Sequence, residues 1–324
     1  MNLSTKGIRL NKIPDSTSNI FHEYQKLSTA VSSDYSFVQG GGGNVSIKTD
    51  KDLIVKASGT RLSEATTLMG FVILNREVAK ECIKSGSSLQ HAVAVDSPDG
   101  RPSIEAPLHV ECGGKYVVHV HSVGAIAIGL IEDGFAFCAE EGWQYVEYVL
   151  PGEPLLSALK SSENFSSPAG VSILANHGLL VWDTSLENCI KRVALAEDKC
   201  RNYFAGKNSS RGIDEIKNGI DLENNKSLDF GSVISDRWLQ FILENTLFPD
   251  QTVFLSGVKF ENLIQDNLHL NIEPLSMGQK EMLKLLHLLG KILRPEDCKR
   301  PLSTSEVSTL LGLDSEKYRK EKIK

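Results

Sequence analysis

Over its first two-thirds, the chain alternates short apolar runs with longer stretches that carry an apolar stripe. Runs rich in Val and Ile favour strands, and apolar positions at helical spacing favour helices. The pattern predicts strands at 44–48, 53–56, 116–121, 171–175 and 179–182. It predicts helices at 20–32, 104–111 and 186–204. This alternation is typical of a mixed α/β domain.

The last third has a different pattern. Residues 206–230 are rich in Asn, Lys, Ser, Asp and Glu and nearly lack large apolar side chains, which favours a polar linker. We therefore expect a metal-binding α/β domain at 1–205, a linker at 206–230 and a smaller, mostly helical extension at 231–324. In the extension the pattern predicts helices at 238–247 and 278–293 and a short strand at 252–255. With no close acidic pair and only His269 and His287, the extension is expected to be structural.

Composition and charge exclude several classes of function. A net charge of −6, with no basic cluster before the C-terminal tail, does not favour binding to nucleic acid or to an acidic membrane. The first residues are polar, and the longest apolar run, 123–131, is too short to span a bilayer. None of the six cysteines lies in a Cys-x-x-Cys pair. We therefore expect reduced thiols in a cytoplasmic protein.

The strand predicted at 116–121 carries His119 and His121. Because side chains alternate along a strand, both imidazoles project from one side, and two of them form half of a transition-metal site. Alone, this pair is explained equally well by two histidines that happen to alternate. A third histidine, His177, lies at a turn between two apolar runs. Three imidazoles leave one metal position open to substrate, which is the catalytic arrangement.

A carboxylate with acid–base potential lies at Glu105, close to the start of the predicted helix. His109 follows one turn later on the same face. Such a carboxylate can act as a general base or as a further metal ligand. Taken alone, this segment favours a helix-capping role for Glu105. Beside the three histidines, that preference reverses.

A run of four glycines, 40–43, precedes the strand at 44–48. Glycines permit positive φ angles and let backbone N–H groups approach an anion. The run lacks the Gly-Lys-Ser/Thr of a nucleotide-binding loop and does not fit Gly-x-Gly-x-x-Gly. Asn44 follows it, and Ser58, Gly59 and Ser103 lie in further polar turns. Each is an ordinary turn by itself, but together they could bind an oxyanion beside the metal.

In this order the motifs resemble the class II aldolase/adducin family. They are Gly-Asn-x-Ser at 43–46, Ser-Gly at 58–59, Pro-Ser-x-Glu-x-x-x-His at 102–109, His-x-His at 119–121 and Asn-His-Gly at 176–178. The resemblance covers roughly residues 20–205. It implies a three-layer α/β/α fold around a mainly antiparallel sheet, assembled as a homotetramer with active sites at subunit interfaces. It also implies a lyase that cleaves a ketose, preferably a ketose 1-phosphate, through a metal-stabilised enediolate.

The same resemblance implies a role for each motif. His119, His121 and His177 would bind one divalent ion per chain, zinc or a similar metal. Glu105 would be the catalytic acid/base and would also be able to touch the metal. A further acid would come from a neighbouring subunit, for which Tyr145, Tyr148 and Tyr203 are unranked candidates. The residues implied for the substrate phosphate are Gly43, Asn44, Ser58, Gly59 and Ser103.

Some segments resemble one particular group of aldolases. They look like the aldolase half of bifunctional rhamnulose-phosphate aldolase/dehydrogenases, at 40–48, 102–109, 148–155 and 247–254, with 314–319 similar to the stretch that follows. Ile104 departs from the family, where sugar-phosphate aldolases commonly carry a second serine, and this leaves the phosphate preference open. Two alternatives remain: an epimerase or dehydratase on this fold, and a non-catalytic adducin-like interaction protein. Retention of the three histidines and Glu105 argues against the second.

Overall fold

A seven-stranded sheet is the centre of the fold. The computed structural model describes residues 15–66, 70–207, 227–229, 236–264 and 269–322. Across the sheet the strands are β3 (Phe71–Asn75), β2 (Asp52–Lys56), β1 (Asn44–Lys48), β4 (Tyr116–Val120), β7 (Gly178–Asp183), β6 (Gly170–Leu174) and β5 (Gln144–Val146). The β5–β6 pair is parallel and the other five pairs are antiparallel. The expectation of a mainly antiparallel sheet is confirmed.

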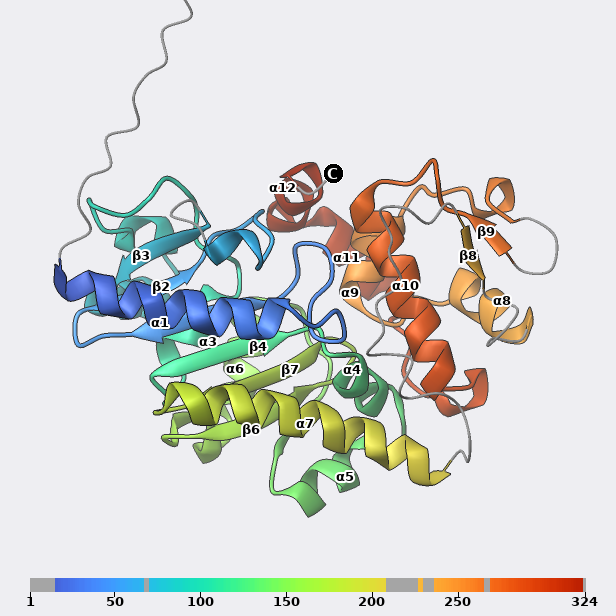
Figure 1. The fold of residues 1–324 in the computed structure, drawn as a ribbon, viewed down its shortest axis with the longest axis horizontal. Helices are drawn as coiled ribbons and strands as arrows, with labels where there is room; N and C mark the ends of the chain where they lie inside the picture. The colour runs from blue at the N-terminus through green and yellow to red at the C-terminus, as the bar shows by residue number, and fades with distance from the viewer. Residues whose placement is uncertain (1–14, 67–69, 208–226, 230–235, 265–268, 323–324) are drawn as a thin grey trace, which may run out of the picture.

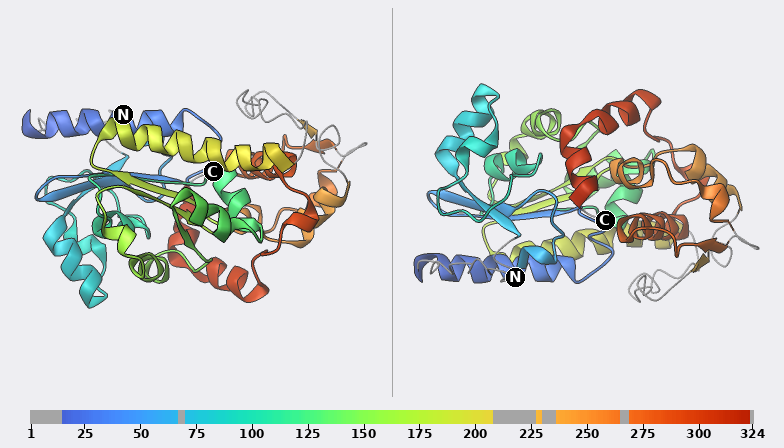
Figure 2. Two further views of the ribbon diagram at one scale, coloured as in Figure 1. Left: turned by 90° about the horizontal axis from the view of Figure 1, so that it is seen from below. Right: turned by 90° about the horizontal axis from the view of Figure 1, so that it is seen from above.

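Helices cover both faces of this sheet, as Figures 1 and 2 show. One face packs against α1 (Asp15–Ser32), α4 (Val123–Leu130) and α7 (Leu186–Lys207), and the other against α2 (Arg76–Ser85), α3 (Ala106–Glu111) and α6 (Glu153–Lys160). Strand alternation assigns the core: Val118 and Val120 lie in the cluster beneath α1 and α7, whereas Val117 packs toward α3 and α6. The predicted three-layer α/β/α fold is confirmed.

Several elements of this domain escaped the sequence prediction. They are β3, β5, α2, α4, α5 (Gly134–Glu141) and α6. In α4 every residue is buried, so the helix has no polar face and its sequence shows no stripe. Single helical turns complete the domain at Glu64–Thr66, Leu89–Ala92 and Glu163–Ser166. Among the described residues, no helix combines the length and the apolar composition that crossing a bilayer requires.

The extension is mostly helical, as predicted. Its helices are α8 (Asp236–Glu244), α9 (Pro249–Leu255), α10 (Met277–Ile292), α11 (Thr304–Gly312) and α12 (Asp314–Lys322), with single turns at Phe260–Asn262 and Pro295–Asp297. A two-stranded sheet joins β8 (Ser227–Asp229) to β9 (His269–Asn271). The strand predicted at 252–255 is wrong, because these residues belong to α9. That helix begins at Pro249, whose fixed φ suits a first helical turn, and it is buried on every side, which hides its periodicity.

The boundary between domain and extension stays a prediction. Of the linker predicted at 206–230, residues 208–226 and 230 lie outside the described residues. Most buried apolar side chains of the extension, including Trp238 and Leu286, belong to the same apolar cluster as Val118 and Val120 of the sheet. The extension is therefore packed on the domain through a shared core. In Figure 1 its last helices, α11 and α12, lie at the end of the sheet where β4 finishes.

Candidate active site

The three histidines meet at one end of the sheet. His119 lies on β4, His121 directly follows that strand, and His177 lies in the turn between β6 and β7. All three are buried, and one nitrogen from each lies within 4.8 Å of the others. His119 Nδ1 lies 3.0 Å from the carbonyl oxygen of Leu179 on the neighbouring strand. If that nitrogen donates, Nε2 of His119 keeps its lone pair for a ligand.

The turn that carries His177 has an unusual backbone. Asn176 adopts a φ of 57°, in the left-handed region that Asn tolerates better than most residues. Its side-chain amide donates to the carbonyl oxygens of Leu247, at 2.9 Å, and of Arg300. Both acceptors belong to the extension. The turn is therefore held by residues far away in the sequence.

Glu105 faces the histidines. Its Oε1 lies 3.2 Å from Nε2 of His119 and 3.1 Å from Nε2 of His177. At the start of α3, within the described chain, the Glu105 side chain makes no capping hydrogen bond. Burial opposes ionisation, yet the facing histidines hold the pKa of Glu105 well below its usual range. Burial in turn lowers the pKa of His177 to about 4, so this imidazole is neutral near pH 7.

This donor set fits a divalent transition metal. In the described part of the chain, Nε2 of His119 and Nε2 of His121 are buried without a hydrogen-bond partner. Buried polar atoms normally have one, so these nitrogens point to a ligand. Three imidazoles with a carboxylate beside them are donors that zinc and related ions accept. An ionised Glu105 and a neutral His177 are also the protonation states that metal binding requires.

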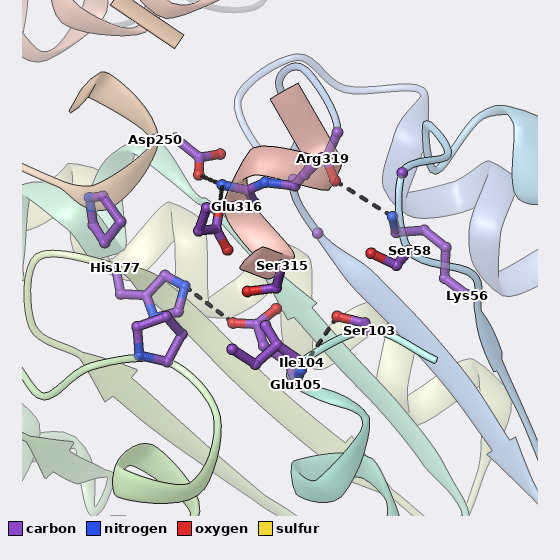
Figure 3. A pocket seen from close by; sticks show the side chains of 16 residues that line it. Lys56, Ser58, Ser103, Ile104, Glu105, His177, Asp250, Ser315, Glu316 and Arg319 are labelled. Atoms are coloured by element: carbon purple, nitrogen blue, oxygen red, sulfur yellow. Dashed lines mark hydrogen bonds and ion pairs between the residues drawn. The ribbon is translucent and has the colours of Figure 1, made fainter. Parts of the chain in front are cut away.

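A small cavity of about 30 Å³ lies beside His177, the one member of the triad among its described lining residues (Figure 3). Of the residues predicted to bind substrate, Gly43, Ser58, Gly59 and Ser103 line it, together with Glu105 and His177. Asn44 is not among the described lining residues. It is buried next to His119 on the adjoining strand, in register with it. The structure thus brings four of the five predicted substrate residues to one cavity.

The extension also lines this cavity, which the sequence analysis did not foresee. Pro249 and Asp250 come from α9, and Ser315, Glu316 and Arg319 come from α12. At Gly59, where φ is +75°, a Cβ atom would lie 3.0 Å from side-chain atoms of Tyr318 and Lys322, so α12 packs directly on this turn. The signal was present: both 247–254 and 314–319 carried part of the family resemblance. Neither segment, however, contains a recognisable ligand motif.

The tyrosine candidates lie elsewhere in this chain. Among the described lining residues of the cavity, none is Tyr145, Tyr148 or Tyr203. Tyr203 donates to Asp133, at 3.0 Å, and Tyr145 to the Gly129 carbonyl, at 3.5 Å. Their proposed action from a neighbouring subunit stays a prediction.

Comparison with known proteins adds to this geometry. The sequence pattern that defines the Class II Aldolase and Adducin N-terminal domain matches residues 26–204. The chain belongs to the class II aldolase/adducin family. This membership covers the sheet, the three histidines and Glu105, and it stops before the extension. No curated protein matches the sequence.

Solved structures similar to this family member include the following three. The N-terminal class II aldolase domain of a conserved protein from Thermoplasma acidophilum is 22% identical, with a TM-score of 0.50, covering 62% of this chain and 99% of its own. YgbL from Klebsiella pneumoniae is 21% identical, with a TM-score of 0.43 and coverage of 62% and 97%. A sugar-phosphate aldolase from Thermotoga maritima is 16% identical, with a TM-score of 0.43 and coverage of 57% and 93%. The likeness to the Thermoplasma acidophilum domain, at 22% identity, concerns the fold alone.

Proposed function

We propose that this protein is a divalent-metal-dependent aldolase that cleaves a carbon–carbon bond of a ketose, preferably a ketose 1-phosphate. The observation that carries the proposal is the contact of one Glu105 carboxylate oxygen with two imidazoles of a buried histidine triad. It occurs in a chain whose family includes aldolases by name. An acid–base group at a metal centre is what retro-aldol cleavage needs.

In this proposal His119, His121 and His177 hold one divalent ion per chain, for which Zn²⁺ is our first choice. Zinc binds imidazole nitrogen readily, and three protein ligands leave a position for substrate. When bound, the ion would supply Lewis-acid stabilisation of the charge that develops on the ketose oxygens as the bond breaks.

Glu105 handles the proton at the carbon that keeps the electron pair of the broken bond. Its carboxylate lies beside the nitrogens of His119 and His177, so it reaches any group bound there. It is buried and ionised, so in cleavage it first takes up the proton that the hydroxyl of the departing carbon loses and then gives a proton to the carbon left behind. General acid–base catalysis of this kind typically contributes about 10²–10⁴-fold to the rate.

The turns at Gly43, Ser58, Gly59 and Ser103 receive the substrate phosphate, with Asn44 close to the metal ligands. Lys56 also lines the cavity and adds a positive charge. Its ammonium donates to the carbonyl oxygens of Thr60, at 2.7 Å, and Gly41, at 3.3 Å, and so holds the two loops together. Ile104 presents only hydrocarbon there. The phosphate preference should therefore be smaller than in relatives with two serines.

Ser315, Glu316 and Arg319 of α12 form one wall of this cavity (Figure 3). A substrate bound there would therefore contact the extension as well as the domain.

We also propose a homotetramer with active sites at subunit interfaces, which light scattering would test. All six cysteines are buried free thiols, and this supports a reducing compartment such as the cytoplasm. These two proposals are independent of the chemistry at the histidine triad.

The decisive experiment screens metal-loaded protein against ketose 1-phosphates and the corresponding free ketoses. Aldehyde release is followed by coupled reduction, with His121→Ala as the matched control. We expect release from a ketose 1-phosphate that disappears in the control. An epimerised product without aldehyde would assign the same centre to an epimerase, and an eliminated product would assign it to a dehydratase. Protein that takes up no metal and turns over nothing would indicate an adducin-like interaction protein.

A further inference from the structure

The Nδ1 side of the His121 ring is held by two groups. Asp250 Oδ2 lies 3.0 Å from Nδ1, and both side chains are buried. Gly42 lies against the same edge, since a Cβ atom there would be 2.5 Å from Nδ1. Nδ1 therefore faces the Asp250 carboxylate at ion-pair distance. Nε2, which has no hydrogen-bond partner among the described residues, is then the nitrogen left for a metal.

Asp250 is held in turn from the last helix. Arg319 of α12 forms an ion pair with Oδ1 of Asp250 and another with Glu316, at 2.6 Å. Figure 3 shows the Arg319 guanidinium reaching across the cavity to Asp250. Each Asp250 oxygen thus faces a nitrogen: Oδ1 accepts from Arg319, and Oδ2 lies 3.0 Å from Nδ1 of His121. An Asn in this place could accept from only one of them and would turn its NH₂ group toward the other.

The extension supports a second histidine as well. Asn176, whose left-handed backbone precedes His177, donates to the Leu247 and Arg300 carbonyl oxygens. Leu247 lies three residues before Asp250. The same short stretch of the extension therefore contacts the chain around two of the three histidines, although the family match ends at residue 204.

We propose that Asp250 is a positioning residue for the metal ligand His121, and that Arg319 positions Asp250, so that the C-terminal extension sets the affinity of the metal centre. A carboxylate that accepts the second ring proton of a metal-bound histidine fixes its tautomer and orientation and raises its basicity. The inference rests on the proposed function in one respect, because it requires a metal at the histidine triad.

The test measures metal affinity and does not need a substrate. Apparent dissociation constants for Zn²⁺ and Co²⁺ are obtained by competition with a chelator. The variants are Asp250→Ala, Asp250→Asn and Arg319→Met, with His121→Ala as the reference for loss of a ligand. We expect affinity to fall about 10- to 100-fold in Asp250→Ala, and by a smaller factor in the other two.

A matched ion pair outside the site serves as the control. Asp183, at the far end of β7, is buried and accepts from Arg192 at 2.9 Å. Asp183→Asn and Arg192→Met therefore remove a comparable pair and report any general loss of stability. Metal affinity should stay unchanged in both. Asp250→Asn and Arg319→Met keep approximate size, so they remain informative if Asp250→Ala does not fold.

The outcomes separate this inference from the proposed function. Wild-type affinity in all three Asp250 and Arg319 variants would overturn the inference and leave the metal centre intact. A loss in Asp250→Ala as large as in His121→Ala, with altered visible absorption bands of bound Co²⁺, would make Asp250 a direct ligand and overturn a positioning role. Absence of metal from the wild-type protein would overturn the metal centre, and this inference with it.

Discussion

In the domain, the residues of the candidate site come in short motifs, whereas in the extension they lie on two helices without a recognisable motif. His119 and His121 are two residues apart on one strand, and Glu105 and Ser103 share one turn. Asp250 and Arg319 lie 69 residues apart on two helices that otherwise look ordinary. The two regions meet at His121, which directly follows β4 of the domain and has its Nδ1 partner, Asp250, in the extension.

This difference follows from what each group must do. Metal ligands have to converge on one point, which strand alternation and tight turns provide over a few residues. A supporting carboxylate only has to contact the ring nitrogen that does not bind the metal. Any helix that packs close enough to this nitrogen can supply it. The site residues of the domain can therefore be recognised from sequence motifs, whereas those of the extension can be recognised only from their contacts in the structure.

The largest effect is expected when a proposed metal ligand in the domain is removed. His121→Ala should lower the metal content from near one ion per chain to almost none, because two imidazoles and a carboxylate bind more weakly than three. Elemental analysis after dialysis measures this. The control is His22→Ala, an exposed histidine on α1, which should keep its metal. Full occupancy in both His121→Ala and His177→Ala would refute the metal centre.

A second test asks whether the extension unfolds with the domain. Trp238 of α8 and Trp182 of β7 are both buried, and each indole donates to a backbone carbonyl, of Leu286 and Ser167 respectively. Replacing either with Ala should lower the free energy of unfolding by about 3–5 kcal/mol. Trp238 shares its apolar cluster with Val181 of β7, the strand that carries Trp182 on its other face, so both variants should lower the midpoint of one common transition. Two separate transitions in calorimetry, each sensitive to one variant, would support independent units.

The third prediction separates acid–base chemistry from metal binding. Glu105→Gln keeps the size of the side chain but cannot accept a proton at neutral pH. Turnover should fall at least about a hundredfold while most of the metal is retained. Glu111→Gln, at the other end of α3 where the carboxylate pairs with exposed Lys160, is the matched control. Equal turnover in the Glu105 variant and its control would reduce Glu105 to a structural residue.

The fourth prediction concerns pH and the two buried lysines of the domain. Burial lowers the pKa of Lys56 to about 8, so its charge is present below that pH and is lost above it. Binding of inorganic phosphate, measured by calorimetry, should therefore weaken as the pH rises from about 7 to about 9, with a smaller step in Lys56→Met. Burial also lowers the pKa of Lys48 to about 8, yet this lysine bonds the Gly114 carbonyl away from the cavity. Lys48→Met should keep the weakening of phosphate binding with rising pH. Loss of this pH dependence in Lys48→Met would contradict its assignment to Lys56.

The smallest expected effect is on phosphate binding when Ile104 is replaced. It tests whether this residue limits the preference for a phosphorylated substrate. Ile104→Ser adds one hydroxyl to the cavity wall beside Ser103. Phosphate binding should strengthen by roughly one neutral hydrogen bond, about 0.5–1.5 kcal/mol. Ile264→Ser, an exposed position in the extension, should change nothing. If phosphate binds neither protein, a neutral or carboxylated sugar becomes the better substrate class.

The sequence by itself determined five of the seven strands of the sheet and the histidine pair. Alternation in 116–121 placed His119 and His121 on one face, and β1 spans the predicted residues 44–48. These properties are local: a strand needs only its own period of two. The order of five motifs determined the family, because each motif is a short turn or strand whose residues are neighbours in the chain.

Only the tertiary structure decided how the extension takes part. The strand predicted at 252–255 is a buried helix, because full burial erased the polar face that would have shown its period. The contacts of Asp250 with His121 and Arg319 join positions 129 and 69 residues apart. Such pairs depend on how helices pack on the sheet, and no local pattern of residues encodes that packing. From the sequence alone, a carboxylate on a helix is expected to be exposed to solvent. Only the tertiary structure shows that this one is buried against an imidazole.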